Sequence, residues 1–463
     1  MNELYLQGFD IYKDIYSTLA GDKKSLVFGI SEPQKAHLAA ASPLPLLYIA
    51  DSEQRALEVT EEIESYGTPA AYLPPKGDVL IGRKSGALSQ ARIAALMRVR
   101  RGEAKVLVTT VEGVFGYLPR PEDLDRATVT LAVGGTASIE EVLRRLIYAG
   151  YERASIAPKK GEFRLAGDSL SVFPINADNP IKIDFLYDEI ESIKLYAPDF
   201  LGVIGREEEA TIAPASEFLL TEGDVREAFK RIENARKLQS RAAKTRTDEI
   251  LSDLSFRAAA NPSDPTLNYL IPFIKERLST VFAYLPGYSV AMDEPKKIFE
   301  GLSRFLVDHY GRVTRLAADG EVLTAHRDAI AGEREIMSAL SEMPQLGLSS
   351  FTERISGREG AYYLNSASLP NYIKNTNLLV GFLEDELREG RRILVFTQDA
   401  DRAEILKRIL GDKADKVTYV PRKLRHGFVS RSERTTYVGS GDILSPASAL
   451  RVPTRPLIAP KIG

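Results

Sequence analysis

The chain has 463 residues, of which 44% are hydrophobic and 27% charged, so it is long enough for several domains with ordinary cores, and disorder is not expected. Its formal net charge of -3 excludes a general electrostatic attraction to nucleic acid. With no cysteine and only 4 scattered histidines, disulfides, thiolate zinc sites and cysteine nucleophiles are excluded, and we expect no metal and no cofactor. The amino end lacks a signal-peptide pattern and no apolar run reaches about 18 residues, so the sequence predicts a soluble, cytoplasmic protein without membrane contact.

The first predicted element has the outline of a phosphate-binding loop. Residues 26–41, LVFGISEPQKAHLAAA, read as a short apolar strand, one glycine and a lysine that opens an alanine-rich helix. In the pattern Gly-x-x-x-x-Gly-Lys-Ser/Thr, backbone amides, the lysine and the hydroxyl hold a nucleotide and its Mg²⁺. Gly29 and Lys35 match this pattern, whereas Gln34 replaces the second glycine and Ala36 the hydroxyl. The stretch is therefore an ATP site, the remnant of one, or a chance match.

Two segments far apart in the chain predict the same unit of strand, polar turn and helix. Residues 46–50 form the first strand, and the helix after it ends at Gly67. Another apolar strand is expected within residues 104–115. Residues 393–396 begin the second unit, whose helix ends at Gly411. The repetition suggests two related α/β layers, although any α/β unit has this pattern.

Between these units, the pattern predicts a small α+β module. Ser138 and Glu141 form a capping box before an amphipathic helix that stops at Gly150. Two runs of alternating polarity, residues 161–174 and 180–196, follow and are separated by the turn-rich INADNP. We expect these two runs to form an antiparallel hairpin.

Alternation along this hairpin predicts one exposed patch. Lys182 and Leu186 lie on the face opposite the apolar side chains of their strand, as do Arg164 and Ala166 on theirs. If the strands pair, these four residues form a patch with two cations around a small apolar centre, a composition typical of protein-binding surfaces. A single exposed leucine is common, however, so an ordinary solvated face is the alternative.

The remaining segments carry weaker signals. Residues 206–262 are charged and are predicted to be helical, ending at the breaker NPSDP. The last 20 residues contain four prolines without periodicity and are expected to be an extended linker or tail.

Four motifs together carry a resemblance to a known family. Residues 151–196 resemble domain 2 of the UvrB-homology module of the bacterial transcription-repair coupling factors, the Mfd family, and of UvrB proteins, through a Gly-Glu-Phe strand, a Phe-Pro strand end and an acidic turn. Residues 106–124, VLVTTVEGVFGYLPRPEDL, resemble a segment of domain 1a. Residues 282–297, FAYLPGYSVAMDEPKK, resemble the approach to the UvrB Walker B motif. Residues 419–444 resemble the end of domain 3 of the coupling factors and favour that family over UvrB.

The resemblance implies a particular domain organisation. The expected fold is multidomain α/β, in which a degenerate RecA/helicase-like α/β domain contains an inserted small α+β domain and is followed by a second small α/β domain. The expected limits are 1–122 for domain 1a, 123–207 for domain 2, 208–345 for the mainly helical domain 1b, 346–445 for domain 3, and 446–463 for a linker or tail.

The resemblance also implies a function in DNA repair. In the family, domain 2 recruits UvrA, so the chain is expected to be a monomeric scaffold that links stalled transcription to nucleotide excision repair. By the same resemblance, RNA polymerase contact and ATP-driven translocation are expected to belong to family domains absent from this chain. Contact of this chain with DNA is expected to be weak or indirect.

The docking positions of the family map onto the two predicted strands. Ala166 and Lys182 stand where the family has arginines, and Leu186 stands where it has a phenylalanine. Arg164 lies two residues from Ala166 on the same predicted face and can replace its charge, while Lys182 keeps charge without the bidentate geometry of arginine. The resemblance therefore implies a UvrA-binding patch of Arg164, Ala166, Lys182 and Leu186.

A UvrB-like ATP-dependent DNA helicase or repair ATPase is the alternative function. The resemblance places Asp293 and Glu294 at a degenerate Walker B position. Pro33 removes an amide donor from the phosphate cradle, Gln34 adds a side chain there, and Ala36 removes the Mg²⁺-binding hydroxyl. We therefore expect no catalytic residue and no enzymatic activity in this chain.

Direct DNA binding is a third hypothesis. It would rest on the arginines of one predicted helix, Arg92, Arg98, Arg100 and Arg101. Because acidic segments balance these charges, a helix face with solvated arginines is the favoured interpretation.

Overall fold

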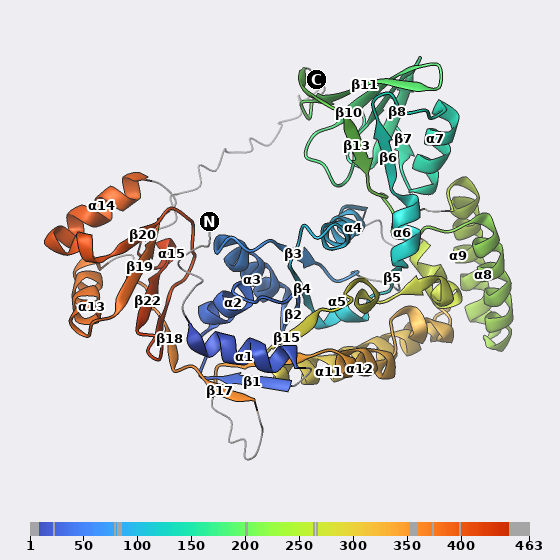
Figure 1. Ribbon diagram of the computed structural model, residues 1–463. Helices are drawn as coiled ribbons and strands as arrows, with labels where there is room; N and C mark the ends of the chain where they lie inside the picture. The colour runs from blue at the N-terminus through green and yellow to red at the C-terminus, as the bar shows by residue number, and fades with distance from the viewer. Residues whose placement is uncertain are drawn as a thin grey trace, which may run out of the picture.

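The computed structural model describes most of the chain, in ranges separated by short gaps. These ranges are 9–21, 24–77, 80, 86–199, 202–262, 264, 267–351, 360–372, 375–397 and 400–443. The expected tail, residues 446–463, lies outside them. The protein is a mixed α/β structure with a central parallel sheet, a small sheet domain at one end and a second α/β part at the other (Figure 1). Within the described ranges, no helix combines the length and apolarity needed to cross a bilayer.

The central sheet has seven strands, and all of its pairings are parallel. In spatial order the strands are β17 (Ala361–Tyr363), β1 (Lys24–Phe28), β16 (Gln345–Ser349), β15 (Ser289–Asp293), β2 (Leu46–Ala50), β4 (Val106–Thr110) and β3 (Ala70–Leu73). The first predicted strand, residues 46–50, is confirmed, as is the one within residues 104–115. A fully parallel sheet requires cover on both faces, which agrees with the uninterrupted apolar runs of β2 and β4.

Helices cover both faces of this sheet. Tyr48 points into one buried cluster together with Val59 of α3, whereas its neighbour Leu47 points into another together with Ile93 of α4. The helices of the first face are α1 (Asp10–Ala20), α2 (Glu32–Ala40) and α3 (Glu53–Ser65). Those of the second are α4 (Gly86–Arg100), α5 (Val111–Phe115) and α11 (Pro295–Ala318).

The small sheet domain follows α6 (Pro121–Ala127) and is drawn in green tones in Figure 1. Its helix is α7 (Ile139–Tyr148), which begins at the predicted cap, where the Ser138 side chain accepts a hydrogen bond from the Glu141 N–H. Strands β6 (Val129–Ala132) and β13 (Glu209–Ile212) pair with each other. The main sheet has the order β12 (Val203–Glu207), β11 (Glu189–Tyr196), β10 (Ile181–Leu186), β9 (Ser169–Val172), β8 (Glu162–Ala166) and β7 (Glu152–Arg153).

The predicted hairpin is wrong in one respect. Each of the two runs folds back on itself, so that β8 pairs with β9 and β10 pairs with β11. The runs do meet in antiparallel orientation, but through β9 and β10. The strand of Arg164 is therefore not adjacent to the strand of Lys182. The turns are made by Gly167, with φ +60°, and by Tyr187, with φ +58°.

A mainly helical region follows. It contains α8 (Glu222–Ala235), α9 (Arg241–Ala260), α10 (Ile271–Ile274) and α12 (Glu333–Glu342). Single-turn helices lie at η1 (Arg236–Leu238), η2 (Leu267–Leu270), η3 (Lys275–Arg277), η4 (Val281–Tyr284) and η5 (Thr324–Ala329), and β5 (Leu118–Pro119) pairs with β14 (Leu278–Ser279). The prediction of helix from residue 206 is wrong for its first part, because residues 203–207 and 209–212 form β12 and β13.

The second α/β part has a mixed five-stranded sheet, at the left of Figure 1. Its strands are β18 (Ser366–Ser368), β21 (Phe428–Ser430), β22 (Thr435–Val438), β19 (Arg392–Phe396) and β20 (Thr418–Val420), and its helices are α13 (Thr376–Arg388), α14 (Ala400–Leu410), η6 (Gly411–Lys416) and α15 (Ser440–Ile443). The predicted strand 393–396 is confirmed within β19.

Aromatic packing joins this part to the central sheet domain. His37 of α2 is fully buried, and its ring lies 5.3 Å from that of Phe428 and 4.8 Å from that of Tyr437. Tyr66, at the end of α3, packs against the same Tyr437. Because one buried cluster includes residues from both parts, separating them would expose aromatic surface to water.

His326, in η5, is a buried histidine that should make stability depend on acid. It is fully buried, with Nδ1 accepting a hydrogen bond of 3.1 Å from the Leu323 N–H, and burial lowers its pKa to about 4. Since an unfolded histidine titrates near pH ~6.5, its stabilising contribution is complete above that pH and is lost as the pH falls towards the folded value.

We expect the free energy of unfolding of the wild type to fall by about 3 kcal/mol more than that of His326→Gln between pH ~6.5 and ~4, measured by urea unfolding. An NMR titration of His326 with a midpoint near the unfolded value would contradict this prediction.

Candidate functional site

The phosphate-loop-like segment is contacted by the edge strand β17 of the central sheet and by β18 of the second α/β part. Gly29 follows β1 with φ +61°, a conformation that favours glycine. A Cβ added there would lie 2.4 Å from the Tyr363 ring, so this ring packs directly over the loop backbone. Beside it, the Ser31 and Ser366 hydroxyls lie 2.5 Å apart. Tyr363, at the end of β17, and Ser366, at the start of β18, therefore occupy the space beside the loop.

Lys35 lies in the first part of α2 and is fully buried. Its Nζ donates to three carboxylates, at 2.6 Å to Asp293 Oδ1, 2.7 Å to Glu294 Oε1 and 2.8 Å to Glu32 Oε1. Burial alone would lower the pKa of Lys35, but the charges of Asp293 and Glu32 raise it above its ordinary value. The ammonium is thus held charged, and its three donors are all used.

Asp293, the last residue of β15, is the centre of this network. Besides Lys35, it accepts hydrogen bonds from the Tyr48 hydroxyl at 2.8 Å and from Arg55 Nε at 3.1 Å. Burial alone would raise the pKa of Asp293, but Lys35 and Arg55 lower it below its usual range. Glu294 follows in a left-handed conformation with φ +58° and accepts from the Ser350 N–H at 2.8 Å.

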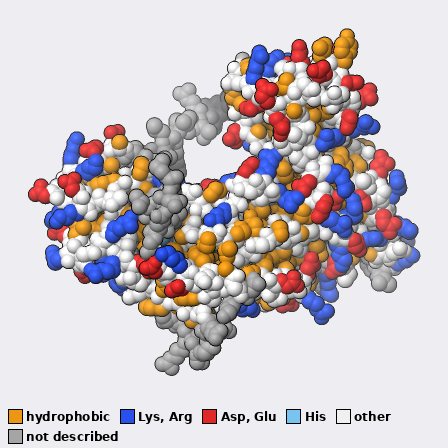
Figure 2. All heavy atoms as spheres, viewed as in Figure 1, with side chains coloured by type: hydrophobic (Ala, Val, Ile, Leu, Met, Phe, Trp, Pro, Cys, Tyr) orange, Lys and Arg blue, Asp and Glu red, His pale blue; other side chains and the backbone are white. Residues whose placement is uncertain are grey.

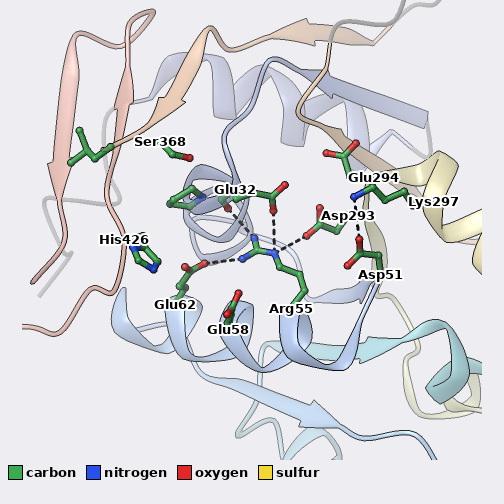
Figure 3. A pocket seen from close by; sticks show the side chains of 12 residues that line it. Glu32, Asp51, Arg55, Glu58, Glu62, Asp293, Glu294, Lys297, Ser368 and His426 are labelled. Atoms are coloured by element: carbon green, nitrogen blue, oxygen red, sulfur yellow. Dashed lines mark hydrogen bonds and ion pairs between the residues drawn. The ribbon is translucent and has the colours of Figure 1, made fainter. Parts of the chain in front are cut away.

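A pocket of about 340 Å³ opens beside this network, between α2, α3 and the second α/β part (Figure 3). Its charged and titratable lining residues are Glu32, Asp51, Arg55, Glu58, Glu62, Asp293, Glu294, Lys297 and His426. Carboxylates outnumber cations in this set, so the pocket disfavours a polyphosphate.

The residues of the loop do not fit a nucleotide with Mg²⁺. Gln34 is buried and donates to the Tyr12 hydroxyl at 3.2 Å, and Ala36 belongs to the buried core. The carboxylates of Glu32, Asp293 and Glu294 are close enough to share a cation, but the Lys35 ammonium lies among them. The structure thus brings together Lys35, Asp293 and Glu294 from the sequence prediction, while Gln34 and Ala36 face away from them.

The arginines of α4 are paired with carboxylates. Arg92 is not solvated as expected: it is fully buried, and its Nε donates to Glu217 at 2.5 Å. Lys76 contacts the same carboxylate at 2.9 Å. The other pairs are Arg98 with Glu64, Arg100 with Asp125 and, directly after the helix, Arg101 with Glu103. These contacts leave little unpaired positive charge on this helix for DNA.

The four predicted docking residues lie on the outer face of the six-stranded sheet. Ser171 of β9 stands opposite Arg164 on one side and Lys182 on the other, so the three share one row and one face. Ala166 and Leu186 are also exposed, the latter by 55%. The structure therefore keeps the predicted residues on one face but inserts a strand between their two strands.

Asp184 is a residue of this face whose role the sequence analysis missed. Its carboxylate lies 2.6 Å from Lys194 Nζ and 3.6 Å from Lys182 Nζ, and it accepts hydrogen bonds from Ser169 and Ser192. Although burial alone would raise its pKa, these partners lower it to about 2. The sequence shows that Asp184 lies two residues after Lys182 and hence on the same face. Its partners on the neighbouring strands, Ser169 and Ser192, follow only from the register of the strand pairing.

Comparison with known families identifies the small sheet domain. Residues 129–218, which contain β6 to β13, match the family model of the UvrB interaction domain. This part of the chain is therefore similar to UvrB interaction domains.

The whole chain is similar to two groups of curated proteins. It is 21% identical over 427 residues to the transcription-repair-coupling factor of Bacillus subtilis, which covers 89% of this chain and 36% of that protein. It is 25% identical over 323 residues to UvrABC system protein B of Treponema denticola, covering 61% of this chain and 48% of the relative. With the Caldicellulosiruptor bescii protein of the same name it shares 26% identity over 435 residues, covering 86% and 64%.

These matches confirm the resemblance that the sequence motifs predicted. The chain is related to the transcription-repair-coupling factors and to UvrB. The matched regions are consistent with the UvrB-like module of the coupling factors. It spans between about a third and two thirds of the length of these relatives.

Proposed function

We propose that the chain is a non-catalytic, UvrB-like scaffold of a transcription-repair-coupling factor, which recruits UvrA in nucleotide excision repair. The observation that carries this proposal is the UvrB interaction domain at residues 129–218, with Arg164, Lys182 and Leu186 on its outer sheet face. Cations beside an exposed apolar side chain suit a protein contact that excludes water around charged pairs.

The hydrogen bonds of Lys35 support the part of this proposal that the chain is not catalytic. A lysine whose donors are all bonded to Glu32, Asp293 and Glu294 cannot bind phosphate without breaking that network. In the proposal, the seven-stranded part is a degenerate RecA/helicase-like domain that carries the interaction domain. Because β16 and β17 belong to its sheet and β13 pairs with β6, the proposed limits move from 345 to beyond 363 and from 207 to beyond 212.

The cellular setting belongs to the same proposal. The scaffold acts as a cytoplasmic monomer, its contact with DNA is weak or indirect, and RNA polymerase is contacted through other parts of such a factor. The ion-paired arginines of α4 support a minor role for DNA.

Lys182→Glu tests this function. We expect it to weaken the binding of purified UvrA by more than about 30-fold, because a reversed charge at a contact shielded from water costs on the order of 2 to 5 kcal/mol. Isothermal titration calorimetry measures the change. The matched control is Arg144→Glu, an exposed cation on α7 of the same domain, which should bind UvrA like the wild type. Undiminished binding by Lys182→Glu would contradict the proposed docking face.

A further inference from the structure

A row of basic residues crosses the outer face of the interaction domain from β8 to the edge strand β12. The register places Arg164 opposite Ser171, Ser171 opposite Lys182, Lys182 opposite Lys194, and Lys194 opposite Arg206. Residues that pair across strands lie on the same face. Since neighbouring strands are ~4.8 Å apart, the four steps from Arg164 to Arg206 span about 19 Å.

The centre of this row is neutralised within the protein. Asp184 holds Lys194 at 2.6 Å and lies 3.6 Å from Lys182, and the hydroxyls of Ser169 and Ser192 fix its carboxylate. The central lysines therefore share a negative charge that a partner would otherwise provide. Their ammonium groups are also held in place before any partner arrives.

The two ends of the row differ from its centre. Arg164 and Arg206 are exposed, and neither forms an ion pair with any residue in the described part of the chain. Along β12, the register shifts after Gly205, so that Val203 stands opposite Tyr196. Tyr196 lies two residues after Lys194 and hence on the same face, and Val203 is 52% exposed. At the sheet edge, Arg206 and Val203 thus place a cation and an exposed apolar side chain on the face that carries Lys182 and Leu186.

We infer that the docking face extends to the edge strand β12, and that its partner is an acidic protein surface with two separate carboxylate groups, one opposite Arg164 and one opposite Arg206. This inference rests on the proposed UvrA-docking function and adds Arg206 as a second anchor, that is, a second residue that binds a carboxylate of the partner. Two arginines with free guanidinium groups can each bind a carboxylate in bidentate geometry, and their separation fixes the orientation of the partner.

The charge pattern favours a protein over nucleic acid. A phosphate backbone carries negative charge at short, regular intervals, so the Asp184 carboxylate in the middle of the row would face it. The exposed side chains of Leu186 and Val203 have no role in phosphate binding but suit a protein interface. Figure 2 shows charged side chains of both signs beside hydrophobic ones on the visible side of this domain, at the upper right.

The test is UvrA binding by the full chain, measured by calorimetry with single substitutions. We expect Arg206→Glu to weaken binding at least tenfold and Arg206→Gln less, because the neutral side chain removes attraction without adding repulsion. Lys194→Gln should change affinity less than Arg206→Gln, since Asp184 already binds that ammonium. Arg164→Glu combined with Arg206→Glu should multiply the two single effects, as expected for anchors about 19 Å apart.

The possible outcomes separate this inference from the proposed function. If Lys182→Glu weakens UvrA binding while Arg206→Glu stays within twofold of the wild type and of Arg144→Glu, the second anchor is wrong and the docking function stands. If the wild type does not bind UvrA, both are wrong. If Arg206→Glu instead abolishes binding of a duplex DNA and leaves UvrA binding unchanged, the row is a nucleic-acid contact and the inference is overturned. Circular dichroism of each variant verifies folding.

Discussion

Replacing Lys35 with methionine is expected to lower the free energy of unfolding by about 3 to 5 kcal/mol, although the volume of the side chain is nearly kept. The substitution leaves Asp293, which is 2% exposed, and its neighbour Glu294 without the ammonium that compensates them. A buried carboxylate without its partner costs more than the ion pair itself contributes, because the charge remains out of water. Guanidinium unfolding followed by circular dichroism measures the loss.

Two further variants make this prediction specific. Glu32→Gln removes the most exposed of the three carboxylates, at 48%, and should cost less than about 1 kcal/mol. Lys35→Met combined with Asp293→Asn should recover part of the loss, because it removes the stranded charge as well. A wild type that hydrolyses ATP, together with a Lys35→Met variant that is inactive but equally stable, would contradict the structural role and favour the ATPase alternative.

The sequence predicted the elements around this lysine but not its partners. The strand at residues 46–50, the glycine and lysine of the loop and the acidic pair at 293–294 were all visible as local patterns. The contact of Lys35 with Asp293 joins residues 258 positions apart, and it depends on the order of strands in the sheet. Local patterns contain no information on that order. The departures of Gln34 and Ala36 from the phosphate-loop pattern could therefore be read from the sequence, while the bonding of Lys35 could not.

In the docking face, too, the sequence predicted single elements but not which strands are neighbours, although these strands are close together in the chain. Alternation placed Arg164 and Lys182 on outer faces, because a strand has a period of two residues. It did not show which strands are neighbours, since that depends on the turns. The Gly167-Asp168 turn is an ordinary hairpin signal within the first run, whereas Tyr187 adopts φ +58°, which a tyrosine rarely does. The row that includes Lys194 and Arg206 follows only from the register that these turns impose.

Glu217→Gln is expected to cost about 3 to 5 kcal/mol of unfolding free energy, because it leaves two cations buried with no anion between them. Arg92 on α4 is fully buried, and Lys76, which follows β3, is 8% exposed. Burial alone would raise the pKa of Glu217, but Arg92 and Lys76 lower it, so the carboxylate is charged at neutral pH. Chemical unfolding at pH ~7 measures the change, with Glu209→Gln, an exposed acid on β13, as the matched control.

The position of Glu217 gives this substitution a second expected effect. The residue lies in the segment that leaves the UvrB interaction domain, whereas Arg92 and Lys76 belong to the central sheet domain. Removing the carboxylate should therefore loosen the attachment of the interaction domain before it unfolds that domain. Limited proteolysis should show faster cleavage near residues 213–221 in Glu217→Gln than in Glu209→Gln, at denaturant concentrations where both retain their secondary structure. Equal cleavage rates and equal stability would show that the buried ion pairs do not hold the two domains together.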